Sequence, residues 1–211
     1  IPSGIYEEPI IIDKPITVIG NKDVYFTINN HKQAITIDAD NVSLQHISIN
    51  YHSDRTDGAA LVINSNRNQL DHITIETTGR GIFLDNAHEN ILHHITLRGN
   101  ERLPIQSRQR GIDMWKSNEN TIHDSTISHV EDGIYIESSS HNVVYDNRIT
   151  YSRYGYHLMF TKETELYRNE SAENISGMMI MGTNGTKGYE NKLTFNQKNV
   201  QSLGLLLFDV Q

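Results

Sequence analysis

The sequence predicts an all-β chain that winds into a right-handed parallel β-helix, a solenoid built from coils of about 22 residues. Gly111, Gly133, Gly155 and Gly177 are each separated by 22 residues, and each begins a short apolar run. Within these runs apolar and polar residues alternate, as in the string GIYIE, which is the two-residue period of a strand. A constant period of this size marks repeats that stack on one another, whereas a propeller blade needs about 40–45 residues.

The two ends of the chain differ in how complete they look as coils. The opening string GIYEEPIIIDKPITVIG alternates apolar and polar residues, and Pro9 and Pro15 fall at strand edges, where a missing donor is tolerated. The last apolar run, Leu205–Phe208, ends in mid-coil at Gln211. An uncapped solenoid exposes its apolar interior. We therefore expect residues 1–211 to form a single domain, the amino-terminal part of a longer solenoid with no cap at its carboxyl end.

Two intervals between the repeated glycines are longer than the basic period. The 30-residue interval that ends at Gly111 leaves eight extra residues around Glu101–Arg108, and the 27-residue interval that ends at Gly204 leaves five around Asn196–Val200. Both insertions come just before a glycine-led strand. Because loops at such an edge often carry function, we expect both to wall the same outer face of the solenoid.

A second column of residues follows the same period as the glycines. Ser125, Asn147, Asn169 and Asn191 are 22 residues apart. An asparagine amide can donate and accept hydrogen bonds at once. We therefore predict an internal ladder in which each amide satisfies backbone groups of the neighbouring coils.

Composition excludes several classes of function. The chain carries 26 acidic and 18 basic residues and a formal net charge of −8, with no clustered Lys/Arg face, so we expect no nucleic-acid partner. It contains no cysteine, which excludes disulfides, zinc–thiolate sites and thiol nucleophiles. No stretch approaches the roughly 18 consecutive apolar residues of a membrane helix, so we expect no transmembrane segment.

Strand alternation places one unusual group of side chains on the outside of the solenoid. If the first and third residues after each glycine point inward, the second and fourth point outward. Coils lie about 4.8 Å apart, and alternate residues of a strand about 6.7 Å apart. His157, Met159, Met179 and Met181 then form a rectangle of one imidazole and three thioethers. Thioethers are soft ligands, so this set favours Cu(I) over Mg, Ca or Mn.

The same two outward columns supply neighbours for this predicted copper site. Tyr135 and Glu137 lie one coil before it, where they can contact the ligands without binding the metal. Phe208 lies one coil after it, and Trp115 occupies the same column two coils before. Exposed aromatic side chains often serve protein docking, so we assign Trp115 and Phe208 to a partner surface.

Three alternative readings of this face remain open from the sequence. The methionines can form an apolar patch that a loop or partner covers. The inward and outward sets can be exchanged, which would bury His157 and expose Met178. The face can also serve a polysaccharide lyase, a C5-epimerase or a glycan-binding module, because such enzymes need carboxylates and a proton acceptor converging on a groove. The residues available for that chemistry are Asp85, Asp113, Tyr135, Glu137 and His157, with Trp115 as a ring for sugar stacking.

Further columns recur at the turns. His46, His72 and His94 occupy matching places in the strings LQHISI, LDHITI and LHHITL, so we expect them to stack. Stacked histidines can bind metal, and a turn column imposed by the repeat also explains them. Two more columns recur with the same period. We expect the first to be a stack of outward-facing rings and the second to be a column of charged residues that are partly paired. The first contains His93, His123, Tyr145, Tyr167 and Tyr189, and the second contains Asp124, Asp146, Arg168 and Glu190.

The residues of the predicted copper site also carry a family resemblance. The run DGIYIESSSHNVVYDNRITYSRYGYHLMFTKETELYRNESAENISGMMIMGTN resembles the NosD family of exported accessory proteins for nitrous-oxide reductase. Its more specific part is RYGYHLMF, followed one coil later by GMMIM and then by LGLLLFD. The opening string is also similar, although many β-helices of the carbohydrate-binding and sugar-hydrolase type share it. The resemblance extends over nearly the whole chain.

This resemblance implies a function and a set of partners. Members of the family act in the periplasm, help to insert copper into the metal centres of nitrous-oxide reductase during denitrification, and are not known as enzymes. They work with an ABC transporter and a lipoprotein copper chaperone. The string His157-Leu158-Met159 and the positions Met179 and Met181 are carried over as candidate copper ligands. We therefore expect a Cu(I)-binding accessory protein without catalytic residues.

Overall fold

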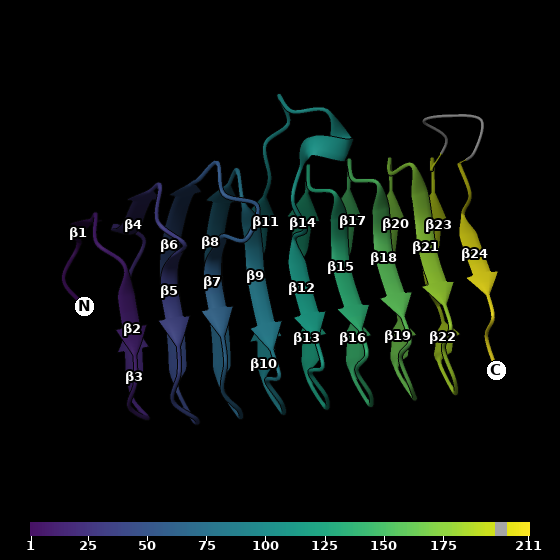
Figure 1. Ribbon diagram of the computed structural model, residues 1–211, viewed down its shortest axis with the longest axis horizontal. Coiled ribbons are helices and arrows are strands. Elements are labelled where there is room, and N and C mark those ends of the chain that lie inside the picture. The colour runs from purple at the N-terminus through teal and green to yellow at the C-terminus, as the bar shows by residue number, and fades with distance from the viewer. Residues whose placement is uncertain (197–201) are drawn as a thin grey trace.

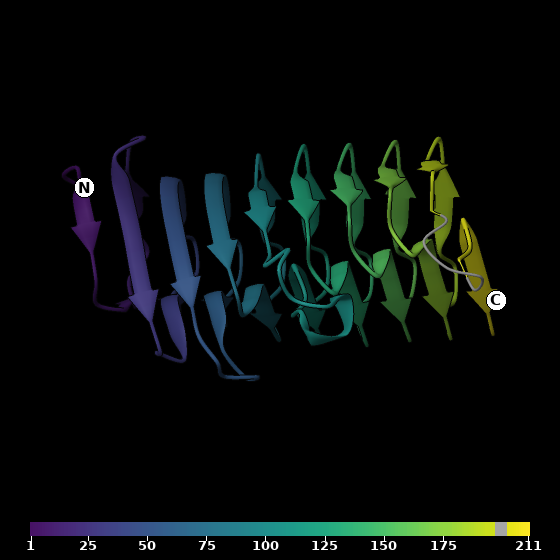
Figure 2. The ribbon, with the colours of Figure 1, turned by 90° about the horizontal axis from the view of Figure 1, so that it is seen from above.

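Short parallel strands stack into an elongated solenoid. The computed structural model describes residues 1–196 and 202–211, and in this part of the chain every strand pairing is parallel. The amino and carboxyl ends lie at opposite ends of the stack (Figures 1 and 2). The predicted parallel β-helix is confirmed. Among the described residues no helix has the length and apolar character to cross a membrane.

The described strands form two sheets, one of nine strands and one of fifteen, which together enclose the core. The nine-stranded sheet contains β2 (Ile10–Ile12), β5 (Gln33–Ile37), β7 (Ala59–Ile63), β9 (Arg80–Asp85), β12 (Ile112–Trp115), β15 (Asp132–Glu137), β18 (Tyr154–Met159), β21 (Ser176–Met181) and β24 (Leu205–Phe208). The fifteen-stranded sheet contains β1 (Gly4–Tyr6), β3 (Thr17–Ile19), β4 (Val24–Asn29), β6 (Ser43–His52), β8 (Gln69–Thr77), β10 (Ile91–His93), β11 (Thr96–Arg98), β13 (Thr121–His123), β14 (Thr126–Ser128), β16 (Val143–Tyr145), β17 (Arg148–Thr150), β19 (Glu165–Tyr167), β20 (Glu170–Ala172), β22 (Lys187–Tyr189) and β23 (Lys192–Thr194).

The first and third residues after each repeated glycine point into the core, as predicted. Ile134, Ile136, Tyr156 and Leu158 are fully buried, and their register from β15 to β18 is Ile134 beside Tyr156 and Ile136 beside Leu158. Met178 also lies inside at 3% exposure, so the exchanged arrangement is excluded. Aliphatic side chains stacked coil upon coil thus form one continuous core.

The repeated glycines are required by close approach of neighbouring coils. A Cβ atom built on Gly111 would lie 2.5 Å from the carbonyl oxygen of Gly133, and one on Gly133 would lie 2.5 Å from that of Gly155. Neither residue has a positive φ. The column therefore consists of glycine because any side chain would strike the next coil, and not because of backbone conformation.

Asparagine amides form the predicted internal ladder. The Asn147 backbone N–H donates to Asn169 Oδ1 at 3.1 Å, and the Asn169 N–H donates to Asn191 Oδ1 at 3.0 Å. The Asn169 Nδ2 also donates to the carbonyl of Val144 at 2.8 Å. A second ladder of the same kind, which the sequence analysis did not identify, runs through Asn68, Asn90, Asn120 and Asn142.

A left-handed residue turns the chain at one corner of each coil. Such a residue breaks strand alternation, so that its side chain and the preceding one lie together on the outside. His46, His72 and His94 have φ of 54°, 53° and 51°, and Asp146 continues the column at 54°. The predicted turn column, ring stack and charge column are therefore confirmed. The rings of Tyr145 and Tyr167 lie 4.9 Å apart and are nearly parallel.

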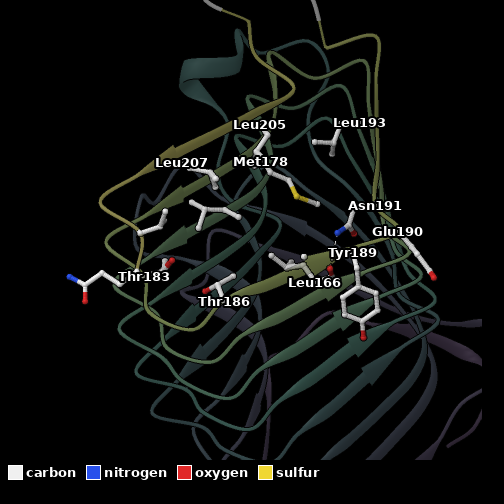
Figure 3. Close-up of a pocket in the computed structure, with 14 residues that line it drawn as sticks. Leu166, Met178, Thr183, Thr186, Tyr189, Glu190, Asn191, Leu193, Leu205 and Leu207 are labelled. Atoms are coloured by element: carbon white, nitrogen blue, oxygen red, sulfur yellow. Dashed lines mark hydrogen bonds between the residues drawn. The ribbon is translucent and has the colours of Figure 1, made fainter.

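The carboxyl end of the stack contains an open apolar hollow. Its volume is about 440 Å³, and Figure 3 shows Met178, Leu193, Leu205 and Leu207 around it. Leu205 and Leu207 occupy inward positions but are 47% and 54% exposed, because no described coil covers them. This hollow is separate from the outward face that carries the predicted copper ligands.

The first insertion forms a loop with a short 3-10 helix, η1 (Ile105–Ser107). It lies at the edge where the strands of the nine-stranded sheet begin (Figure 1). Arg108 fixes it by donating to the carbonyls of Leu103 and Tyr151, both at 2.9 Å. These contacts hold the loop over the corner that precedes the sheet, beside Tyr151. That it walls the outer face stays a prediction. Of the second predicted loop, residues 197–200 lie outside the described residues, and Asn196 is buried within a short asparagine ladder.

Candidate functional site

The outward side of the nine-stranded sheet, termed here the outer face, brings the predicted copper ligands together. His157 of β18 lies beside Met179 of β21, and Met159 lies beside Met181. His157 is 7% exposed, and the three methionines are half-buried. These four residues are termed the His/Met site. Its arrangement in two rows and two columns is the one that strand alternation predicts.

The imidazole of His157 is fixed by a buried carboxylate. Its Nδ1 lies 2.9 Å from Asp132 Oδ2, and Asp132 is fully buried. Burial alone would raise the pKa of Asp132, but the bonds from His157 and Arg153 outweigh it and lower that pKa. An ionised carboxylate can only accept, so Nδ1 donates the proton. The opposite nitrogen, Nε2, is buried and has no hydrogen-bond partner among the described residues.

Tyr135 and Glu137 lie one coil before the His/Met site, as predicted. The Tyr135 hydroxyl donates to Glu137 Oε2 at 2.7 Å and lies 3.2 Å from Met159 Sδ. Burial and the bond to Glu137 raise the pKa of Tyr135, so its hydroxyl stays protonated. The phenol thus links a carboxylate to one of the thioethers.

A layer of three arginines covers part of the outer face, which the sequence analysis did not foresee. Arg110 lies over the Tyr135 ring at 3.6 Å, and Arg153 grips Asp132 through two bonds of 2.9 and 2.8 Å. Arg80 completes the layer by pairing with Asp113 at 3.2 Å. As a result Tyr135, predicted to be on an open wall, is only 3% exposed.

A positional signal for these missed residues exists in the sequence. Arg80 and Arg110 each directly precede a repeated glycine, and Asp132 occupies the same position one coil later. The residue before the glycine begins the outward side of the strand. Treating this position as a third outward column would have placed Arg80 and Arg110 on the outer face.

Asp113, one of the carboxylates of the enzyme reading, is held by two arginines. It is 2% exposed and lies within 3.3 Å of both Arg80 and Arg110. Burial raises the pKa of Asp113, and the two guanidinium groups reduce that rise. Its oxygens are therefore engaged by arginine.

The fixed charges around the site leave a small negative excess. Three guanidinium groups, those of Arg80, Arg110 and Arg153, lie around the site together with four carboxylates, a formal excess of one negative charge among these groups. The carboxylates are Asp113, Glu131, Asp132 and Glu137. A monovalent cation balances this excess, whereas a divalent cation would leave the cluster positive.

The predicted docking residues flank the His/Met site. Trp115 is 39% exposed and Phe208 is 62% exposed. Phe208 lies beside Met181, and Trp115 lies beside Glu137, so one column contains both aromatic residues with Glu137, Met159 and Met181 between them. The outer face therefore offers soft, uncharged ligands in its centre and exposed aromatic rings at either end.

Two kinds of chemistry are compatible with this face. One imidazole nitrogen and three sulfurs suit a soft cation such as Cu(I). The buried pair of Asp132 and His157, together with Tyr135, also offers groups that can hold or move protons. Asp85, the remaining carboxylate of the enzyme reading, lies beside Trp115 at the edge of the face.

Comparisons with known proteins give one family match. The family model NosD, described as a periplasmic copper-binding protein, matches residues 16–202. A search of curated protein sequences finds no match. The matched range includes the whole His/Met site.

Solved structures of similar fold are glycan-active or viral proteins. The GH136 lacto-N-biosidase from Eubacterium ramulus has a TM-score of 0.69 at 9% identity, over 97% of this chain and 51% of that one. The A-module of the Azotobacter vinelandii mannuronan C-5 epimerase AlgE6 has a TM-score of 0.68 at 12% identity, over 98% and 70%. The enzymatically active domain of bacteriophage CBA120 tailspike protein 2 has a TM-score of 0.63 at 9% identity, over 98% and 42%. The chain thus spans about half the length of the biosidase, and these likenesses establish the fold alone.

Proposed function

Because the chain belongs to the NosD family of periplasmic copper-binding proteins, we propose that it binds Cu(I) at the His/Met site and delivers it to a partner protein. His157 Nε2 and the sulfurs of Met159, Met179 and Met181 hold the ion. Copper here is cargo, and the protein has no catalytic role. We propose the periplasm as its location.

The observation that carries this proposal is the unpartnered Nε2 of His157. A buried nitrogen without a hydrogen bond is costly unless another ligand satisfies it. Its partner on the other side, Asp132, fixes Nδ1 as the protonated nitrogen, which leaves a lone pair on Nε2 for a metal. A carboxylate that orients a ligating histidine in this way is the usual second contact at protein metal sites.

Exchange of the ion follows from the same ligand set. The thioethers and the imidazole carry no charge, so none of the ligands attracts the ion as an anionic ligand would. The ion can therefore leave the site for a partner protein. The half-buried methionines lie between the exposed rings of Trp115 and Phe208, which we propose as the docking surface for the donor and acceptor proteins.

The client is proposed from the family. The family model matches residues 16–202, a range that contains the His/Met site. We propose nitrous-oxide reductase as the acceptor of copper, and an ABC transporter with a copper chaperone as the other partners of the system.

Anaerobic titration with Cu(I) against a competing chelator tests copper binding. Wild type is expected to take up one Cu(I) per chain, and the combined variant Met159→Ile, Met179→Ile, Met181→Ile is expected to lose it. Isoleucine keeps the face apolar and removes only the sulfur atoms, so the fold should survive.

The matched control is Met178→Leu, because Met178 belongs to the same strand but points into the core. This variant should bind copper like wild type. Equal binding by wild type and the combined variant, or no binding by either, would show that the methionines serve packing or docking instead.

A second candidate is a glycan-modifying activity on the same face. It is supported by the buried Asp132–His157 pair beside Tyr135 and by Asp113 under its two arginines. This reading predicts that wild type acts on oligouronides and that His157→Gln and Asp113→Asn abolish turnover, whereas the three methionine substitutions leave it unchanged. Wild type that turns over no oligouronide, assayed by ultraviolet absorbance for lyase and by NMR for epimerase products, removes this candidate.

A further inference from the structure

A cluster of imidazoles lies in the amino-terminal half of the solenoid, away from the outer face. It is at the corner formed by the left-handed residues His72 and His94. His72 and His94 are left-handed turn residues, and each follows a residue, Asp71 or His93, whose side chain also faces outward. Asp71 of β8 lies beside His93 of β10 in the strand register. The ring of His46 stacks on that of His72 at 4.8 Å between ring centres, and His72 stacks on His94 at 4.4 Å, so a column of imidazoles runs along the solenoid. Asp71, His72, His93 and His94 are termed the imidazole cluster.

The ligand atoms of the imidazole cluster gather around Asp71 Oδ1. Asp71 Oδ1 lies 2.6 Å from His72 Nδ1, 2.9 Å from His94 Nδ1 and 3.3 Å from His93 Nδ1. The Nδ1 atoms of His93 and His94 face each other at 3.0 Å. Asp71, His93 and His94 thus offer one compact set of three ligand atoms, and Asp71 shares a second set with His46 and His72.

Protons alone do not satisfy this arrangement well. If His93 and His94 both carry a proton on Nδ1, the two N–H groups oppose each other at 3.0 Å. If one of them does not, its lone pair lies 3.3 Å or less from the carboxylate oxygen of Asp71, which repels it. A cation placed among Asp71 Oδ1 and the Nδ1 atoms of His93 and His94 removes both conflicts, because both nitrogens and the oxygen then point a lone pair at positive charge.

We propose that the imidazole cluster is a second metal site, which takes a divalent late transition-metal ion of the Zn²⁺ or Cu²⁺ type. Ligands at bond lengths near 2.0–2.1 Å around a tetrahedral ion are about 3.3 Å from one another. Asp71 Oδ1 and the Nδ1 atoms of His93 and His94 are 2.9–3.3 Å apart, so they can supply three of the four ligands. Imidazole nitrogen with one carboxylate suits Zn²⁺ and Cu²⁺ and contains no sulfur, so this site and the His/Met site select different ions.

Calorimetric titration with Zn²⁺ tests the inference without involving the His/Met site. Zn²⁺ has no redox chemistry, so it does not convert to a monovalent ion that prefers thioethers. Wild type is expected to bind one Zn²⁺ per chain, and His72→Asn with His94→Asn to weaken binding at least about tenfold. Asparagine tolerates the left-handed conformation, so the turns are retained.

Two further variants make the result specific. Asp71→Asn keeps all three rings and should also weaken Zn²⁺ binding, even if the double histidine variant folds poorly. His141→Asn is the matched control, since His141 is another left-handed histidine that pairs with a carboxylate, Glu163 at 3.1 Å. This control and the combined methionine variant should bind Zn²⁺ like wild type.

Electron paramagnetic resonance of the Cu²⁺-loaded protein reads out the ligands directly. Splitting from several nitrogens is expected in wild type and should be lost in the double histidine variant. Failure of wild type to bind Zn²⁺, or unchanged binding in both the double variant and Asp71→Asn, overturns the inference. Because the Cu(I) titration uses other residues, either proposal can fail while the other stands.

Discussion

Asp132 performs two tasks at the scale of single residues. Its side chain is fully buried, and it orients His157 through Nδ1 and pairs with the half-buried Arg153 through two further bonds. The carboxylate therefore couples the geometry of the candidate ligand to the arginine layer. A substitution of Asp132 should therefore lower both the copper affinity and the stability of the protein.

We predict that Asp132→Asn lowers Cu(I) affinity about 10–100-fold, because the amide no longer secures the tautomer of His157. The substitution also removes one of the two carboxylates that pair with Arg153, which leaves Glu131 at 3.2 Å, so the melting temperature should fall. Chelator competition and thermal denaturation measure the two effects. The control is Asp146→Asn, which removes an exposed pair with Arg168 worth about 0–1 kcal/mol. Equal copper affinity in Asp132→Asn and wild type would contradict the orienting role.

Tyr51 links stability to alkaline pH. It is fully buried, its hydroxyl donates to the carbonyl of His31 at 2.7 Å, and burial raises its pKa above the usual 10.0. The unfolded chain therefore loses this proton at a lower pH than the folded chain does. The contribution of Tyr51 is complete below pH 10.0 and is lost as the pH rises towards the folded pKa.

We predict that Tyr51→Phe makes the decline of the free energy of unfolding above pH 10 shallower than in wild type. At neutral pH the same variant should be less stable by about 0.5–1.5 kcal/mol, because it loses the hydrogen bond from Tyr51 to the carbonyl of His31. Urea denaturation over a series of pH values measures both. Tyr25→Phe, at a residue 39% exposed, should leave the slope unchanged. An unaltered slope in Tyr51→Phe would show that other groups control alkaline unfolding.

Sequence reasoning placed the His/Met site because strand alternation and a fixed period determine which residues become neighbours. It did not find the arginine layer, because Arg80 and Arg110 lie outside the alternating runs, at the position before the glycine. It also did not anticipate that outward-facing Tyr135 and His157 would be buried. Their burial depends on long side chains that lie across the face, which the period of the backbone does not specify.

Each coil is the structural element of this fold, and its contacts with the next coil are made at fixed positions. The glycine column, the two asparagine ladders and the ring stack all repeat these contacts. The period therefore predicted the strands and the ladder through Asn169. The left-handed corner was only partly predictable, since residues as different as His94 and Arg168 adopt it. Its conformation follows from the neighbouring coils, and not from the residue type.

We predict that Gly133→Ala destabilises the protein by about 1–3 kcal/mol, because the added Cβ would lie 2.5 Å from the carbonyl oxygen of Gly155 and force the coils apart. Gly188→Ala is the control, since the nearest atom to its Cβ is Asn191 Nδ2 at 3.7 Å. Urea denaturation of both variants measures the difference. Similar stability of the two variants would mean that the coils separate without cost.

The whole molecule is a one-dimensional stack in which each coil touches only its neighbours. Stability in such a protein is a sum of terms for single coils and for the interfaces between them. The first coil has one neighbour among the described coils, and its Ile5 and Ile11 are 70% and 63% exposed. Local opening should therefore be easier there than in the middle of the stack.

We predict that backbone amides of β1, β2 and β3 exchange with deuterium faster than those of β12, β15 and β18 in this 211-residue chain. The reason is that the central strands lose two interfaces when they open and the first coil loses one. Hydrogen exchange followed by mass spectrometry measures the rates. Uniform rates along the chain would indicate that the solenoid opens as a single cooperative unit.

The constant 22-residue interval between Gly111, Gly133, Gly155 and Gly177 also makes the outer face modular. Removal of one complete coil, from Gly133 to the residue before Gly155, would join Asp132 to Gly155, which would then occupy the place of Gly133 in the glycine column. Asp113 and Trp115 would then lie beside His157 and Met159, while the core, the ladders and the corner kept their geometry. Gain or loss of whole coils can therefore exchange one row of surface chemistry at a time, so that a new site arises by duplication without a new fold.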